Sequence, residues 1–123
     1  MFSQNQYRLI TGQENSFIEC LPLAGVIASE QDALDWVAVC GENCTDRLLI
    51  GSENLSEEFF DLSTTLAGMI LLKFTNYRIR AAALLPPERI THGKFPEMVV
   101  ETNRGNLFRI YFDRSLAEAW LLE

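Results

Sequence analysis

The chain has 123 residues, of which 48% are hydrophobic and 22% are charged, a size and an apolar content that predict one globular domain over residues 1–123. Seventeen acidic against ten basic side chains leave a formal charge of -7, and such a chain is repelled by nucleic acid and by anionic membrane surfaces. Its longest apolar runs, 66–72 and 81–85, are shorter than the ~20 residues of a membrane-spanning helix.

The order of apolar and turn-forming segments predicts nine elements. In chain order we expect strands at 7–11 and 16–21, a helix at 30–44, a strand at 47–50, a helix at 64–76, a strand at 79–85, a short helix at 96–102, a strand at 107–112 and a last helix from 115. Strands that alternate with helices form mostly parallel sheets, and the first two strands are close enough for a hairpin. The predicted fold class is α/β, a single layered domain with a mixed, mostly parallel sheet, an opening hairpin and flanking helices.

Capping residues predict where the helices begin. Ser29 and Ser115 each begin a capping-box pattern, and either Asp61 or Ser63 is placed to cap the helix at 64–76. Before that helix, the segment 55–60 has the composition of a single helical turn with two large aromatic side chains.

The N-terminus and the cysteines predict a cytoplasmic protein. The first residues contain neither a basic nor an apolar segment, so we expect no secretion signal. Cys20, Cys40 and Cys44 are odd in number and include no Cys-x-x-Cys motif, which disfavours a disulfide framework and a structural zinc site. Cys40 and Cys44 lie one helical turn apart, and we expect both to pack in the core as small hydrophobic side chains.

The predicted order resembles the STAS fold of anti-sigma-factor antagonists over nearly the whole chain. Residues 60–68 stand where those proteins carry their Asp-Ser-Ser-Gly-Leu-Gly motif, and residues 113–119 are similar to the start of their last helix. The resemblance implies a regulatory protein that is switched by phosphorylation. Leu62 replaces the first serine of the motif and Thr65 replaces its glycine, which weakens the expectation of a switch.

The chain is more similar to a small bacterial family known only as a domain of unknown function. The matching segments are 32–35, 52–55, 58–62, 67–68 and 73–78. This resemblance implies a fold and no reaction, so it assigns no catalytic residue.

Hydroxyl and acidic side chains gather before the helix at 64–76. Ser63, Thr64 and Thr65 are placed to hold a phosphate at the helix start or to be phosphorylated, although N-capping uses the same residue types and is the more common role. Glu53 and Asp61 belong to an acidic cluster without the spacing of a calcium loop, and a solvated surface explains it better than a cation site. We expect no bound metal, and the scattered glycines predict no nucleotide cofactor.

We prefer a non-enzymatic interaction module to an enzyme. In this hypothesis Leu55, Phe59 and Phe60 form an exposed apolar patch, rimmed by acidic residues, that docks a protein partner or a second copy of the chain. His92 is the only histidine and has no serine or cysteine at a recognisable catalytic spacing. No catalytic residue is therefore assigned, although the sequence does not exclude an enzyme.

The alternative is a small ligand or substrate held at the carboxyl ends of the two central strands. Open α/β sheets place their binding clefts there. The groups expected to converge on such a cleft are Glu53, Asn54, Thr64, Arg78 and His92. Arg78 is also expected on one face of the strand at 79–85 together with Arg80, where pairing with carboxylates is the more common role.

Overall fold

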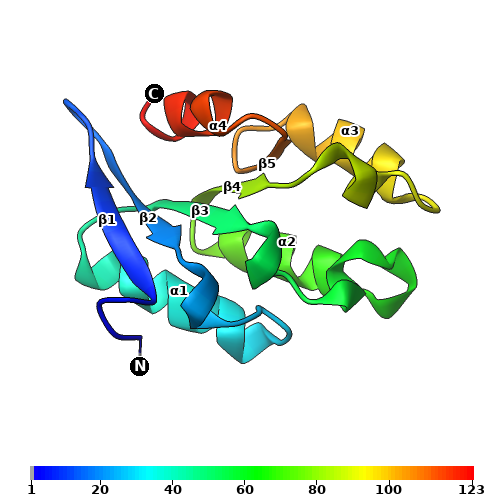
Figure 1. Ribbon diagram of the computed structural model, residues 1–123, viewed down its shortest axis with the longest axis horizontal. Coiled ribbons are helices and arrows are strands. Elements are labelled where there is room, and N and C mark those ends of the chain that lie inside the picture. Colours follow the sequence, from blue (N-terminus) through cyan, green and yellow to red (C-terminus); the bar gives the residue numbers. More distant parts are fainter. Residues whose placement is uncertain (1) are drawn as a thin grey trace.

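The computed structural model describes residues 2–123 and confirms the predicted order of strands and helices (Figure 1). The elements are β1 (Tyr7–Thr11), β2 (Ser16–Cys20), α1 (Glu30–Glu42), β3 (Arg47–Gly51), α2 (Leu66–Asn76), β4 (Arg80–Leu84), α3 (Phe95–Asn103), β5 (Phe108–Tyr111) and α4 (Arg114–Leu121). Short 3-10 turns connect several of them. Among these described residues, none of the helices combines the length and the apolar character needed to cross a membrane.

The five strands form one mixed sheet in the order β1-β2-β3-β4-β5. β1 pairs antiparallel with β2, and every later pair is parallel. Each parallel connection runs to the next strand along the sheet, and such crossovers share one hand, which places α1, α2 and α3 on the same face. Figure 1 shows α1 and α2 below the sheet and α4 above it. The sheet is therefore covered on both faces, as the composition of β3 predicts.

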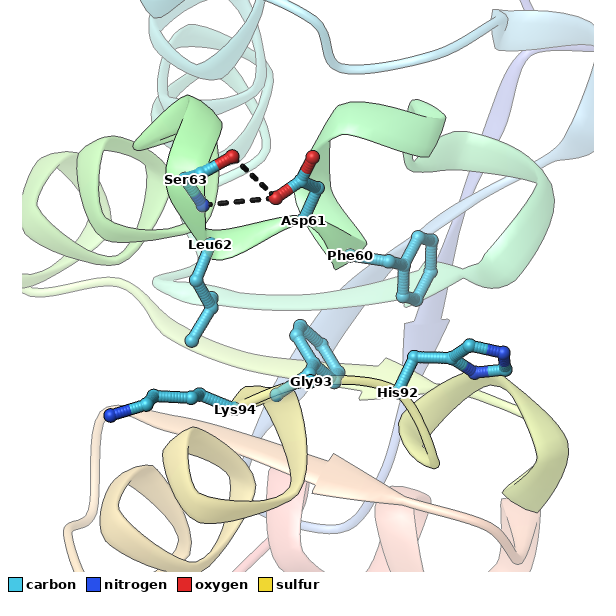
Figure 2. A pocket seen from close by; sticks show the side chains of 8 residues that line it. Phe60, Asp61, Leu62, Ser63, His92, Gly93 and Lys94 are labelled. Atoms are coloured by element: carbon cyan, nitrogen blue, oxygen red, sulfur yellow. Dashed lines mark hydrogen bonds between the residues drawn. The ribbon is translucent and has the colours of Figure 1, made fainter.

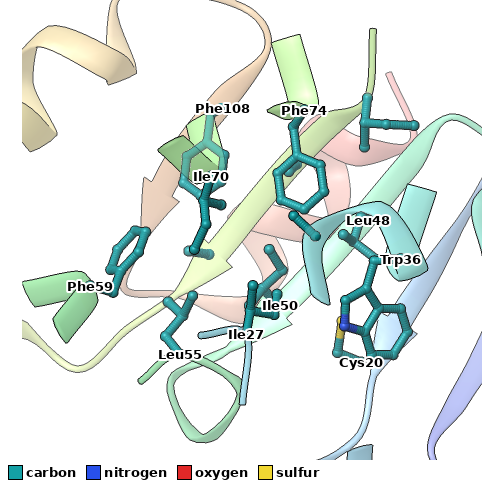
Figure 3. Close-up of a cluster of buried hydrophobic side chains, with 14 of the residues drawn as sticks. Cys20, Ile27, Trp36, Leu48, Ile50, Leu55, Phe59, Ile70, Phe74 and Phe108 are labelled. Carbon is teal, nitrogen blue, oxygen red and sulfur yellow. The ribbon is translucent and has the colours of Figure 1, made fainter. Parts of the chain in front are cut away.

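The hydrophobic core is divided between these two faces. In β3, Leu48 and Ile50 join the large cluster under α1, α2 and α3, whereas Leu49 joins a smaller cluster under α4. Figure 3 shows the larger cluster, with aromatic side chains at both ends and aliphatic ones between them. Three fully buried alanines, Ala81–Ala83, line β4, and their small size lets helices approach the sheet closely from both sides.

Arginines on the upper face hold the C-terminal end of α4 against the sheet. Arg80 donates a hydrogen bond to the carbonyl of Trp120 over 2.7 Å, and Arg47 donates to the carbonyls of Leu121 and Glu123. These carbonyls lie at the negative end of the helix dipole, where cationic side chains are stabilising.

Arg78 and Arg80 have different environments. The side chain of Arg80 bonds to α4, whereas Arg78 precedes β4 with a left-handed φ of 56° and is exposed. The prediction that both lie on one strand face is wrong.

The first helix buries Cys40, as predicted, but it ends before Cys44, which is exposed. α1 ends at Glu42, and Cys44 follows in a left-handed conformation with φ 55°, exposed to solvent. Trp36 is only 2% exposed and fills the position next to β1 and β2. Cys40 is buried as expected, and burial raises the pKa of its thiol to about 12, so this thiol is unreactive.

Two helix starts also differ from the predicted caps. Asp113 caps α4 by accepting hydrogen bonds from the N–H groups of Ser115 and Leu116, so Ser115 lies inside the helix. Ser29 caps α1 as predicted, but the carboxylate of Asp32 accepts from the N–H of Ala28, one residue before the cap. An aspartate reaches back less regularly than the longer glutamate of a capping box.

Candidate functional site

Two loops that follow neighbouring parallel strands enclose an open groove. The 3-10 turns of residues 57–64 come after β3, and residues 87–95 come after β4, so both lie beyond the carboxyl ends of the strands. The cavity between them has a volume of about 540 Å³. It is lined by Phe60, Asp61, Leu62, Ser63, His92, Gly93, Lys94 and Phe95. We call it the Phe60 groove, and Figure 2 shows it between the two loops.

Phe60 forms an apolar wall of the groove, and its neighbour Phe59 anchors the loop. Phe59 is fully buried, whereas Phe60 is half-buried and faces Phe95 with ring centroids 5.4 Å apart. The two adjacent rings meet edge to face at 5.4 Å, an arrangement that aromatic pairs favour. One aromatic side chain therefore holds the turn in the core while the other lines the cavity.

A cationic side chain covers the outer side of the Phe60 ring. The guanidinium of Arg89 lies 3.9 Å from the ring centroid, and its Nη2 atom is 3.0 Å from Oε1 of Glu57. A second cavity of about 310 Å³ borders this pair and shares Phe60, Asp61 and His92 with the first. The groove therefore continues from an apolar part into a charged part.

Asp61 and Ser63 form the polar rim. Oδ1 of Asp61 accepts hydrogen bonds from the Ser63 hydroxyl over 2.7 Å and from the Ser63 N–H over 3.0 Å (Figure 2). These bonds lower the pKa of the Asp61 carboxyl below its usual range, so it is charged at neutral pH. Asp61 caps the short turn Leu62–Thr64 and not α2 itself, because Thr65 separates them with a left-handed φ of 65°.

The hydroxyls before α2 are mostly used by the turn. Thr64 donates to the carbonyl of Glu58 over 2.7 Å and accepts from the N–H of Leu66. Thr65 is exposed. The carboxylate of Asp61 already supplies the negative charge at this position, so a free phosphate would be repelled by it. Thr65 occupies the N-cap position of α2 without a side-chain cap hydrogen bond, so neither N-capping nor phosphate binding by these hydroxyls is confirmed.

Two of the three predicted docking residues are not accessible. Leu55 is 4% exposed and Phe59 is 0% exposed, because both belong to the large hydrophobic cluster, in which the Phe59 ring lies near the rings of Phe95 and Phe108. An isolated bridge between Ile27 and Leu55 ties the first of them to the loop before α1. Only Phe60 remains at the surface from that predicted patch.

The side chains expected to converge on one cleft are divided among separate places. Glu53 and Asn54 line a cavity of about 280 Å³ at the carboxyl ends of β2, β3 and β4, while His92 lies in the Phe60 groove. Arg78 lies at the opposite, amino end of β4. Asn54 is buried, and its amide bonds to Gly51, Leu21 and Gly25, so it joins loops instead of presenting free polar atoms.

The same cavity contains a buried charge that sequence reasoning missed. Glu19 is 7% exposed, and its Oε1 atom lies 2.9 Å from Nε of Arg8 and 2.8 Å from Nη2 of Arg114. Burial raises the pKa of Glu19, but the hydrogen bonds and charges of Arg114 and Arg8 outweigh burial and hold it below the ordinary value. The register of the opening hairpin places Arg8 directly opposite Glu19. This register is the sequence feature from which the ion pair could have been predicted.

The grouping of His92, Lys94 and Phe95 with Asp61 was also not foreseen. Their proximity could have been predicted from the sequence, because both loops follow strands that were expected to be neighbours in a parallel sheet. Within residues 2–123, the side chains of His, Cys, Asp and Glu form no group of three that is placed to hold a metal ion. The predicted absence of a metal and of a cofactor stays a prediction.

Comparison with known proteins identifies a family for the chain. No curated protein and no solved structure matches the chain, and nothing in these comparisons supports a relationship to STAS domains. A family profile, described as "Domain of unknown function (DUF4180)", matches residues 13–121. That range covers the sheet from β2 onwards and all four helices. The chain therefore belongs to the DUF4180 family.

Proposed function

We propose that this protein is a non-enzymatic regulatory module that binds a protein partner by holding one of its apolar side chains in the Phe60 groove. The observation that carries the proposal is the half-buried ring of Phe60, which faces an open cavity of about 540 Å³. Apolar walls with a few polar groups at the rim are typical of binding pockets, which span about 300–1,000 Å³.

The charges around the groove indicate the chemistry of the partner. Arg89 is engaged by Glu57 and by the Phe60 ring, so it is poorly available to a ligand. Asp61 and Glu88 are exposed carboxylates at the rim. An apolar side chain next to a lysine or arginine would place its ring or aliphatic group against Phe60 and its cation near Asp61.

The resemblance to STAS domains adds a regulatory step to this proposal. Ser63 is exposed at the rim, and its hydroxyl lies 2.7 Å from Asp61 Oδ1. Phosphorylation of Ser63 would add about 1.5 to 2 negative charges beside that carboxylate. The two groups would repel each other, the turn Leu62–Thr64 would lose its cap, and the groove would lose its present shape.

A peptide titration followed by backbone NMR tests the proposal. Peptides that carry a phenylalanine or leucine beside a lysine should shift the amide signals of residues 60–63 and 92–95, and peptides with a glutamate in place of the lysine should bind less tightly. Phe60→Ala should weaken binding at least tenfold, a loss of about 1.4 kcal/mol. Phe112→Ala is the matched control, since Phe112 is a 50% exposed phenylalanine outside the groove.

Two results would contradict this function. The first is the absence of shifts at the groove for every peptide. The second is equal binding by the Phe60→Ala protein when its unfolding curve shows that it is folded. Binding of small aromatic amines with the same affinity as the peptides would favour a small ligand in the groove instead.

A second candidate function is a small-ligand site in the cavity of about 280 Å³ at the carboxyl ends of β2, β3 and β4. It is favoured by Glu19, a buried carboxylate that lines this cavity together with Arg114. A fragment screen by NMR tests it. Shifts at Gly51 and Asn54 that disappear in Glu19→Gln would support this site, and a screen without such shifts would count against it.

A further inference from the structure

The outer edge of β1 has backbone groups without partners. The N–H of Leu21 donates to the carbonyl of Gln6 over 2.9 Å, and the N–H of Gly12 donates to the carbonyl of Asn15 over 2.8 Å. Because these groups alternate along an antiparallel strand, the even-numbered residues of β1 bond to β2, and Tyr7, Leu9 and Thr11 point their N–H and C=O groups away from it. In residues 2–123, no side chain or backbone group bonds to them.

This edge lacks the features that keep other strands from pairing. β1 contains no proline, and its register with β2 runs without a bulge from Tyr7 opposite Cys20 to Thr11 opposite Ser16. Its one charged side chain, Arg8, is engaged by Glu19 on its own sheet. Leu9 is 44% exposed beside the open backbone. Edges of this kind are templates for pairing with another strand.

We propose that two copies of the chain pair antiparallel through β1, with Leu9 opposite the second copy's Leu9, so that the two sheets become one of ten strands. This inference does not depend on the Phe60 groove. In this register Tyr7 lies opposite Thr11 and Arg8 opposite Ile10. The outward groups of Tyr7, Leu9 and Thr11 then form roughly six hydrogen bonds, which is the full set for five paired residues.

Charge and side-chain pairing select this register and this occupant. A register centred on Arg8 would place the two guanidinium groups directly opposite each other, which is destabilising. A register centred on Ile10 would pair only residues 9–11. Residues 2–13 contain no acidic side chain, so the two edges meet without the repulsion that an overall charge of -7 would otherwise produce.

The interface is small, because it consists of one pair of short strands and the side chains beside them. Interfaces below about 1,200 Å² are typical of weak, reversible association. We therefore expect a dimer that forms at high protein concentration and dissociates on dilution.

Sedimentation velocity over a range of concentrations tests the pairing. The wild-type mass should rise from 14.0 kDa toward twice that value, and the amide protons of Leu9 and Thr11 should exchange more slowly as the dimer forms. Leu9→Lys should weaken association at least about tenfold, because residue 9 opposes its own copy and like charges then meet. Leu72→Lys, at a 57% exposed leucine on α2, should dimerise as the wild type does.

A charge-swap experiment tests the register. Leu9→Glu alone should be monomeric like Leu9→Lys, and an equal mixture of the two should regain the dimer, since the lysine of one copy would then face the glutamate of the other. The proposal is overturned if the wild type stays monomeric at millimolar concentration. It is also overturned if Leu9→Lys dimerises as tightly as the wild type, or if the mixture remains monomeric while both proteins are folded.

Discussion

The two edges of the sheet differ in whether their outward backbone groups have hydrogen-bond partners. At β5, the hydroxyl of Thr102 donates to the carbonyl of Phe108 over 2.7 Å. The amide of Asn103 donates to the carbonyl of Ile110 over 3.0 Å and accepts from the N–H of Ile110 over 2.7 Å. These side chains from the end of α3 replace a neighbouring strand. At β1, no comparable group is present within residues 2–123.

The difference shows how one sheet can limit its own assembly. A side-chain amide offers both an N–H donor group and a carbonyl acceptor, the two kinds of group that a backbone residue presents. Asn103 therefore satisfies both backbone groups of Ile110, while Thr102 bonds to Phe108 beside it. With only β1 open, pairing between two copies uses up the free edge and ends at a dimer, whereas two open edges would let sheets join without limit.

The largest effect is expected from removing the side chain that holds the open edge to the core. Trp36 stacks on Phe2 with ring centroids 4.1 Å apart and meets Tyr7 edge to face at 6.4 Å. Trp36→Ala should lower the free energy of unfolding by about 3 to 5 kcal/mol, because it leaves a large cavity under β1. Urea unfolding measures the loss.

The control for this variant is Leu72→Ala, which truncates an exposed leucine and should change the free energy of unfolding by less than about 0.5 kcal/mol. Amide exchange locates the effect, which should be largest at β1 and β2. A loss below about 1 kcal/mol for Trp36→Ala would show that α1 does not support this edge.

A smaller effect is expected from opening the closed edge. Asn103→Ala leaves the N–H and C=O of Ile110 without partners and should lower the free energy of unfolding by about 2 kcal/mol. It should also produce species larger than a dimer in light scattering, because the backbone groups of Ile110 are then free at β5 as well as the edge of β1. Arg104→Ala is the control, since Arg104 has a 75% exposed side chain. A folded Asn103→Ala protein that forms no larger species would contradict the role of Asn103 at this edge.

The smallest effect concerns the charge that ties β1 to the rest of the sheet. The pKa of Glu19 is lowered in the folded protein, so its contribution to stability is present above about pH 4.5 and is lost as the pH falls through the lowered value. Glu19→Gln should cost about 1 to 2 kcal/mol at pH 7. It should also make the stability less dependent on pH below 4.5 than in the wild type.

Glu97→Gln, at an exposed position on α3, is the control for the pH series. Chemical unfolding at several pH values between 3 and 7 provides the comparison. Equal pH profiles for the wild type and Glu19→Gln would show that the two arginines do not hold Glu19 ionised.

Much of the fold could be predicted because it depends on local patterns. Residues 48–50 are apolar on both faces of the strand, and the Pro86-Pro87 pair ends the strand before it. The boundary of α1 was misjudged at Cys44, since a left-handed residue after a helix is decided by the path of the following chain. Trp36 was missed because an aromatic side chain on a helix is placed by what lies opposite it, which is β1.

The candidate site was predicted less well than the fold. Asp61, Ser63 and Phe60 do lie together in the groove, but Leu55 and Phe59 are buried. Composition does not distinguish two adjacent phenylalanines of which one enters the core. The bonds of Asn103 to Ile110, seven residues later in the chain, depend on how α3 lies against β5.

The sequence by itself determined the acidic charge, which follows from composition. It also determined the α/β class and the order of the elements, because periodicity, caps and turn residues act over a few positions. Only the tertiary structure decided which aromatic side chains line the Phe60 groove, which carboxylate is buried between arginines and which edge of the sheet is open. These features depend on contacts between residues far apart in the chain, and a hydrogen bond such as that from Asn103 to Ile110 exists only when packing brings the two segments together.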